Sequence, residues 1–153
     1  MTVVDYNKVI SAITMSIHNV DEWKDIDIYK EKDNEEINTP RIFVWTTNIT
    51  ESGKRTFKPE TYEVVQMMQV RYYPDENSTT KYQDCLDFAH KLKRVLMMID
   101  VDDSKLRGSN INFNIDENIL KFYVDYSYRT FYRPDEIAKM MQLQENYCLK
   151  GER

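Results

Sequence analysis

The scarcity of glycine and histidine excludes much of the chemistry that a chain of this size can perform. Only three glycines occur among 153 residues, and they lie too far apart to form a glycine-rich loop around a phosphate. The two histidines, His18 and His90, are each expected to be a solvated or helix-capping residue rather than a base. HExxH, CxxC and GxSxG motifs are absent, so zinc proteolysis, thiol redox chemistry and an α/β-hydrolase nucleophile have no support. We therefore expect neither enzyme activity nor a cofactor.

The chain also lacks the features of secreted and membrane proteins. No apolar run approaches the ~20 residues of a membrane-spanning helix, and the N-terminus does not have the basic and apolar segments of a secretion signal. The cysteines, Cys85 and Cys148, lie far apart, and we expect two free thiols in a cytosolic chain. The acidic cluster of Asp100, Asp102 and Asp103 lacks the glycine and distal glutamate of a calcium loop, so it predicts an exposed loop and no metal site.

The net charge of −5 comes from one part of the chain. Residues 1–39 contain nine acidic and four basic residues, whereas the other 114 contain 17 of each. The chain therefore has no basic footprint for sequence-specific DNA binding. The basic cluster of Lys91, Lys93 and Arg94 falls near the end of a predicted helix, where the helix dipole favours cations. Lys91 is also expected to pair with Asp87, one helical turn earlier.

Two long alternating segments, residues 61–73 and 118–132, organise the predicted fold. Each places apolar or aromatic residues on one face and polar residues on the other, a period of two that is typical of strands with one face on a core. The predicted core face of the first consists of Tyr62, Val64, Met68, Val70 and Tyr72. That of the second consists of Leu120, Phe122, Val124, Tyr126 and Tyr128.

The second segment contains enough tyrosines to suggest an alternative role, the binding of nucleic acid. Its aromatic residues, Tyr123, Tyr126, Tyr128, Phe131 and Tyr132, are of the kind that stack on RNA bases. Such a platform needs basic residues between the rings, and only Lys121 and Arg129 qualify, with Asp125 between them. The pattern favours a half-buried sheet face over a nucleic-acid-binding module.

The other elements follow from shorter patterns. Helices are predicted at residues 3–18, from a Thr80–Gln83 capping box to Ile99, and from Pro134 onward. Further strands are predicted at 26–29, 41–46 and 110–115, the last forming a hairpin with 119–132, and polar loops at 30–39, 47–60 and 100–109. The economical packing is an α+β fold, with one mixed, mainly antiparallel sheet and helices on one face. We expect a single domain over 1–153, with a core at 1–133 and a C-terminal helical extension at 134–153.

Taken in order, six segments resemble the tail terminator proteins of long-tailed bacteriophages, including small families from phages and prophages of Gram-positive hosts. The segments are VISAI (9–13), IDIYKE (26–31), PRIFVW (40–45), VVQMMQVRYYP (64–74), LKRVLMMI (92–99) and ILKFYVDYSYR (119–129). The resemblance covers roughly residues 3–132 and rests on the order and separation of these segments.

The resemblance implies a structural virion protein without catalysis. Such proteins form a homo-hexameric ring that caps the finished tail tube, ends its polymerisation and offers a joining surface to the head or neck. The implied partners are other copies of the chain, the tail tube protein, the sheath where present, and the head–tail connector, with DNA only as passing cargo and no membrane. The implied place is the head-proximal end of the virion tail, after assembly in the bacterial cytoplasm. The tail can be contractile or flexible, and the particle a phage or a headless tail-like bacteriocin.

Two groups of residues are candidates for the contacts of such a ring. The loop at 47–60 is an interface arm or a plain surface insertion, and the helix after Pro134 carries an adaptable, methionine-rich stripe. The expected subunit or tube interface consists of Lys54, Arg55, Phe57, Lys58, Ile137, Met140 and Met141. An acidic loop, expected to face the lumen where it would not hold passing DNA, consists of Glu31, Asp33, Glu35 and Glu36. The near alternative function is another head–tail connector or tail-completion ring protein; the distant one is a small nucleic-acid-binding α+β module.

Overall fold

The structure contains two α-helices and six strands in the part of the chain that it describes. This computed structural model describes residues 4–30, 39–53 and 61–131. In chain order the elements are α1 (Tyr6–His18), the short 3-10 helix η1 (Asp21–Trp23), β1 (Asp27–Tyr29), β2 (Arg41–Gly53), β3 (Thr61–Tyr73), α2 (Lys81–Leu96), β4 (Met98–Val101), β5 (Ser104–Asp116) and β6 (Ile119–Phe131).

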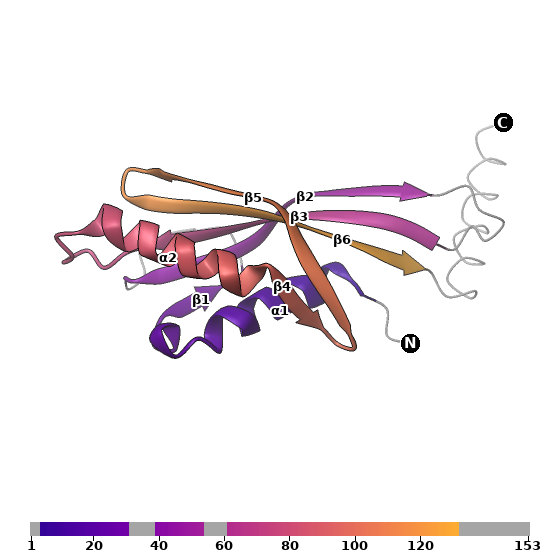
Figure 1. Cartoon of the computed structure of the whole chain (residues 1–153), viewed down its shortest axis with the longest axis horizontal. Helices are drawn as coiled ribbons and strands as arrows, with labels where there is room; N and C mark the ends of the chain where they lie inside the picture. The colour runs from indigo at the N-terminus through magenta and orange to yellow at the C-terminus, as the bar shows by residue number, and fades with distance from the viewer. Residues whose placement is uncertain (1–3, 31–38, 54–60, 132–153) are drawn as a thin grey trace, which may run out of the picture.

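These strands form one sheet in the order β1-β2-β3-β6-β5-β4. β1 runs parallel to β2, and every other neighbouring pair is antiparallel. Both α1 and α2 lie on the same face of the sheet (Figure 1). The expected α+β class, with one mixed and mainly antiparallel sheet, is confirmed. The predicted helix after Pro134 lies outside the described residues, and the division into a core and a C-terminal extension stays a prediction.

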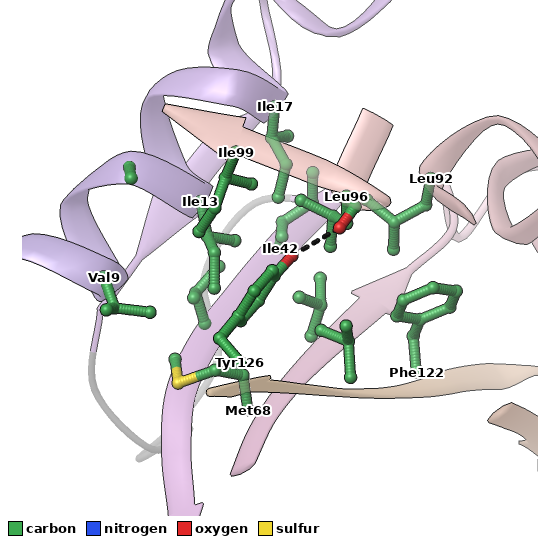
Figure 2. Packing of buried hydrophobic residues seen from close by; sticks show 14 of the residues in the cluster. Val9, Ile13, Ile17, Ile42, Met68, Leu92, Leu96, Ile99, Phe122 and Tyr126 are labelled. Atoms are coloured by element: carbon green, nitrogen blue, oxygen red, sulfur yellow. Dashed lines mark hydrogen bonds between the residues drawn. The ribbon is translucent and has the colours of Figure 1, made fainter. Parts of the chain in front are cut away.

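The hydrophobic core lies between the two helices and the central strands. The alternating faces predicted for β3 and β6 point into it, and Figure 2 shows Met68, Phe122 and Tyr126 meeting side chains from both helices. Val9, Ile13 and Ile17 of α1 and Leu92 and Leu96 of α2 are completely buried there. Each such side chain contributes about 1.5–3 kcal/mol on burial. This core therefore holds the helices against one face of the sheet.

The helix termini differ from the predictions in their hydrogen bonds. α1 begins at Tyr6 because Asp5 is its N-cap, and the Asp5 carboxylate accepts a hydrogen bond from the Lys8 backbone N–H at 2.8 Å. The predicted capping box of α2 is not formed: the Thr80 hydroxyl donates to the Asp84 carboxylate instead, at 3.2 Å.

The predicted pair between Asp87 and Lys91 is also wrong. Gln83 donates to the Asp87 carboxylate at 3.0 Å, one helical turn before it. Lys91 forms its ion pair with Glu22, which precedes it by 69 residues in the chain. A contact with η1, brought close by the tertiary fold, has thus replaced a contact within the helix.

The described parts of two predicted loops are largely strands. The segment from Thr47 to Gly53 continues β2, whose pairing with β3 extends to Gly53 opposite Tyr62, with a bulge at Thr47. The segment 100–109 contains the end of β4, a turn at Asp102 and the start of β5. Both stretches have few apolar residues, so hydrophobic alternation does not reveal them. α2 accordingly ends at Leu96, and Ile99 lies in β4 rather than in the helix.

Candidate assembly surfaces

The residues predicted to make the assembly contacts lie outside the described part of the chain. These are Lys54, Arg55, Phe57, Lys58, Ile137, Met140 and Met141 of the expected interface, and Glu31, Asp33, Glu35 and Glu36 of the acidic loop. The ends of the strands that precede or follow some of these residues in the sequence are described. Gly53 is paired with Tyr62, and Thr61 is paired with Phe131. The end of β2, the start of β3 and the end of β6 therefore lie at the same end of the sheet (Figure 1).

The cysteine, histidine and aspartate residues considered as chemical sites have ordinary structural roles in the described chain. Asp102 forms an ion pair with Lys8 at 2.8 Å, and the described residues contain no group of three side chains suited to holding a metal ion. His18 and His90 are exposed. Cys85 is a buried free cysteine whose thiol donates to the Asn118 carbonyl at 3.4 Å. Burial raises the pKa of this thiol to about 11, so it stays protonated and unreactive near neutral pH. None of the described helices is long and apolar enough to cross a membrane.

The tyrosines of β6 divide between the two faces of the sheet. Tyr126 and Tyr128 are buried on the core face, whereas Tyr123, paired with Gln69, lies on the other. The Tyr126 hydroxyl donates to the Leu96 carbonyl at the end of α2, at 2.6 Å (Figure 2). The Tyr128 hydroxyl donates to the Gln66 side-chain oxygen at 2.9 Å. These rings hold the fold together and do not form a continuous platform for stacking bases.

Gln66 is a fully buried polar residue on the core face of β3, and sequence patterning did not single it out. Its side-chain amide donates to the Thr46 hydroxyl at 2.9 Å and to the Tyr6 carbonyl at 3.1 Å. With the bond from Tyr128, one side chain connects β2, β3, β6 and the start of α1. Burial raises the pKa of the Tyr128 hydroxyl well above its usual range, so it remains a neutral donor. The network braces the sheet where β2, β3 and β6 continue beyond the end of α2 (Figure 1).

The face of the sheet opposite the described helices carries an arginine–aromatic cluster. The Arg41 guanidinium lies over the Tyr73 ring at 4.2 Å, and that of Arg71 lies over the Trp45 ring at 5.0 Å. Phe43 stacks on Tyr29 with 5.1 Å between ring centroids. Such cation–π and aromatic contacts hold long side chains in fixed positions. This face is consequently ordered as well as polar, a combination that suits recognition of another protein surface.

Two strand edges are also open among the described elements. β1 covers only Arg41–Phe43 of β2, so no described strand pairs with the outer edge of β2 from Val44 onward. β4 covers only Ser104–Arg107 of β5, so no described strand pairs with the outer edge of β5 from Ser109 to Asp116. Every residue of that stretch of β5 is at least partly exposed, and the Phe113 side chain is 42% exposed. Unpaired backbone donors and acceptors along such an edge offer a template for another strand.

The comparison with protein families decides the identity of this chain. A family described as "Phage tail terminator protein" matches residues 8–139. The chain belongs to the phage tail terminator family. It is therefore a structural protein of the phage tail, in a family whose members are not enzymes in general. The resemblance found in six sequence segments is confirmed at this level, while the Gram-positive host stays a prediction.

The comparison with solved structures gives a matching fold for this terminator-family chain. A chain from the structure titled "Virion of native gene transfer agent (GTA) particle" matches with a TM-score of 0.56 and 8% sequence identity. The match covers 84% of this chain and 100% of that chain. At such low identity the match shows a shared fold and nothing further. No curated protein matches the sequence.

Proposed function

We propose that this terminator-family protein forms a hexameric ring that caps the finished tail tube, ends its polymerisation and provides the joining surface for the head or neck. The observation that carries this proposal is the family match over residues 8–139, which spans nearly all of the helices and strands described. The ring sits at the head-proximal end of the virion tail and assembles in the cytoplasm of the bacterial host. DNA passes through its lumen as cargo.

The structure supports a role based on protein contacts. Its described surface has an ordered arginine–aromatic face and two open strand edges. The end of β2 and the end of β6 lie at the same end of the sheet, and the expected interface residues follow these two strand ends in the sequence. We assign these residues to a contact with the tube or with a neighbouring subunit. The acidic residues Glu31, Asp33, Glu35 and Glu36 face the lumen in this proposal.

The proposal is tested by reconstitution with the tail tube protein. Light scattering after size-exclusion chromatography is expected to show a hexamer, either for the protein alone or after mixing with tube protein. Electron microscopy of polymerising tubes is expected to show shorter tubes with a ring at one end as the protein is added. Tubes that grow to the same length with and without it would refute the capping function. If the protein forms a ring that does not bind the tube but does bind the head–tail connector, the result would favour a connector or tail-completion protein.

A matched pair of variants tests the assigned contact surface. The double substitution Lys54→Ala with Arg55→Ala is expected to weaken tube capping because it removes two cations from the proposed interface. Lys93→Ala with Arg94→Ala removes the same two side chains from the exposed face of α2 and is expected to leave capping unchanged. Equal capping by both variants would remove residues 54 and 55 from the interface while leaving the capping function standing.

A further inference from the structure

We propose that neighbouring subunits join edge to edge, with the open edge of β2 in one copy pairing with the open edge of β5 in the next. The two edge segments are Val44–Thr50 of β2 and Ser109–Ile115 of β5. The inference rests on the proposed ring and names the surface that builds it. The partner is a second copy of this chain, for three reasons drawn from direction, composition and curvature.

The direction of the strands suits a closed ring. β2 is antiparallel to β3, β3 to β6, and β6 to β5, so β2 and β5 run in opposite directions within one subunit. A rotation about an axis along the strands keeps each strand direction unchanged. It therefore brings β5 of one copy antiparallel to β2 of the next, which continues the antiparallel ladder. Because the two edges differ, the contact is heterologous and generates a ring when the rotation closes.

The composition of the edges suits pairing with each other. Neither edge segment contains a charged residue or a proline, and the first charged residues, Glu51 and Asp116, directly follow the two segments, in a chain that carries 47 charged side chains (21 basic and 26 acidic). Open edges of soluble proteins are usually protected by lysine or proline. An uncharged edge in so charged a chain indicates that it becomes covered in the assembled state.

The two faces of the proposed junction also match. On the core side, β5 presents the half-buried Ile111 and Ile115 and the exposed ring of Phe113, and β2 presents the buried Val44 and the half-buried Ile49. On the opposite side, β5 presents Asn112 and Asn114, and β2 presents Trp45, held under Arg71, followed by the short polar residues Asn48, Thr50 and Ser52 in or next to the segment. A continuous sheet would therefore place the apolar residues of β5 beside Val44 and Ile49 on the core side, with Thr46 between these two, and the asparagines of β5 beside Asn48 and Thr50 on the other side. Phe113, exposed in the single subunit, would gain a cover.

Each edge segment also contains a bulge. In β2 the register shifts at Thr47, and in β5 it shifts between Ser109 and Asn112, where Asn110 has a positive φ of 50°. Bulges bend a strand and increase its twist, and a sheet needs such curvature to close on itself. Their position in both edge segments is consistent with a sheet that curves around a ring axis.

Disulfide trapping tests the pairing directly. Single cysteines replace the exposed residues Thr50 in β2 and Asn112 in β5, in a Cys148→Ser background. Cysteines at Asn48 and Asn114 provide further pairs in case the two strands pair in a different register. Mixing a β2 variant with a β5 variant under mild oxidation is expected to give a mixed dimer. A double variant such as Thr50→Cys with Asn112→Cys is expected to give a ladder that ends at the closed ring. Dimers formed only between identical variants would instead show two-fold pairing and overturn the proposal.

Charge placed on the edges supplies an independent test with a matched control. Thr50→Lys and Asn114→Lys each put a cation beside the incoming strand and are expected to abolish the hexamer in light scattering while leaving circular dichroism unchanged. Ser127→Lys adds the same charge at an exposed position of the central strand β6, on the same face, and is expected to leave the hexamer intact.

These outcomes separate the junction from the function. If the wild type and both lysine variants form the same hexamer, and no β2–β5 disulfide forms, the edge pairing is overturned and the capping ring still stands. A wild-type protein that stays monomeric with and without tube protein would overturn both.

Discussion

The hydrogen bond from Tyr126 to the end of α2 gives a measurable prediction about what holds the helix on the sheet. Leu96 is the last residue of α2, and the last carbonyls of a helix accept no hydrogen bond from an N–H group of the same helix. The Leu96 carbonyl accepts from the Tyr126 hydroxyl at 2.6 Å, and both side chains are completely buried. Tyr126→Phe removes that single oxygen and leaves the aromatic ring in place.

The expected loss of stability follows from the acceptor that remains. A buried carbonyl left without a donor costs about 1–3 kcal/mol. No side-chain carbon is removed, so a cavity contributes little. With a central value of about 2 kcal/mol, and roughly 2–4 °C of melting temperature per kcal/mol for a domain of this size, the expected decrease is ~4–8 °C.

Urea unfolding followed by circular dichroism measures this loss, with Tyr82→Phe as the control. Tyr82 lies in α2 and is 57% exposed, so the same chemical change there is expected to alter the free energy of unfolding by less than ~0.5 kcal/mol. The slope of the free energy of unfolding against urea concentration should be the same for both variants, because the surface area exposed on unfolding is unchanged. Equal stability of the two variants would refute the reasoning and show that the Leu96 carbonyl finds another donor.

Two further predictions concern the same core. Gly108→Ala would place a Cβ 2.7 Å from the Leu96 carbonyl oxygen and 2.8 Å from a Val124 methyl, so urea unfolding is expected to show a loss of about 1–3 kcal/mol; an unchanged midpoint would show that the backbone yields there. Burial raises the pKa of Tyr72 to about 12 and that of Tyr128 further, from an ordinary value of 10.0. The folded state therefore keeps these phenols neutral, and stability is complete below pH ~10 and falls as the pH rises toward ~12 because the unfolded chain loses the protons first. Unfolding measured across this range should show a smaller fall for Tyr72→Phe than for the wild type.

The sequence predicted the parts of the fold that depend on local hydrophobic alternation. β3 and β6 alternate over their whole length, so their core faces were identified correctly, apart from the polar Gln66. The end of β2 and the start of β5 contain only isolated apolar residues such as Ile49 and Leu106, and pairing with a neighbouring strand forms them. Lys91 likewise found its partner in Glu22, which the fold brings close and the sequence does not.

The candidate surfaces show the same limit. The expected interface residues in 54–58 and 137–141 stay predictions, because they lie outside the described residues. The arginine–aromatic cluster was visible only in part: RIFVW and QVRYY each alternate cations with rings, but their contacts require the register that sets Phe43 opposite Arg71. The open edges could not be predicted, because an edge is defined by the order of strands in the sheet and not by any one strand.

The buried amide of Gln66 has a consequence for how reproducibly the subunit is built. If β3 slipped by one residue, Gln66 would turn to the outer face, and Val65 or Met67 would replace it in the core. The Tyr128 hydroxyl and the Thr46 hydroxyl would then lose their shared partner, and the Tyr6 carbonyl would lose a donor. The misaligned form carries several unsatisfied buried groups and is strongly disfavoured. Identical copies thus present the ends of β2, β3 and β6 at the same height, and the proposed ring needs this uniformity for its subunits to contact the tube together.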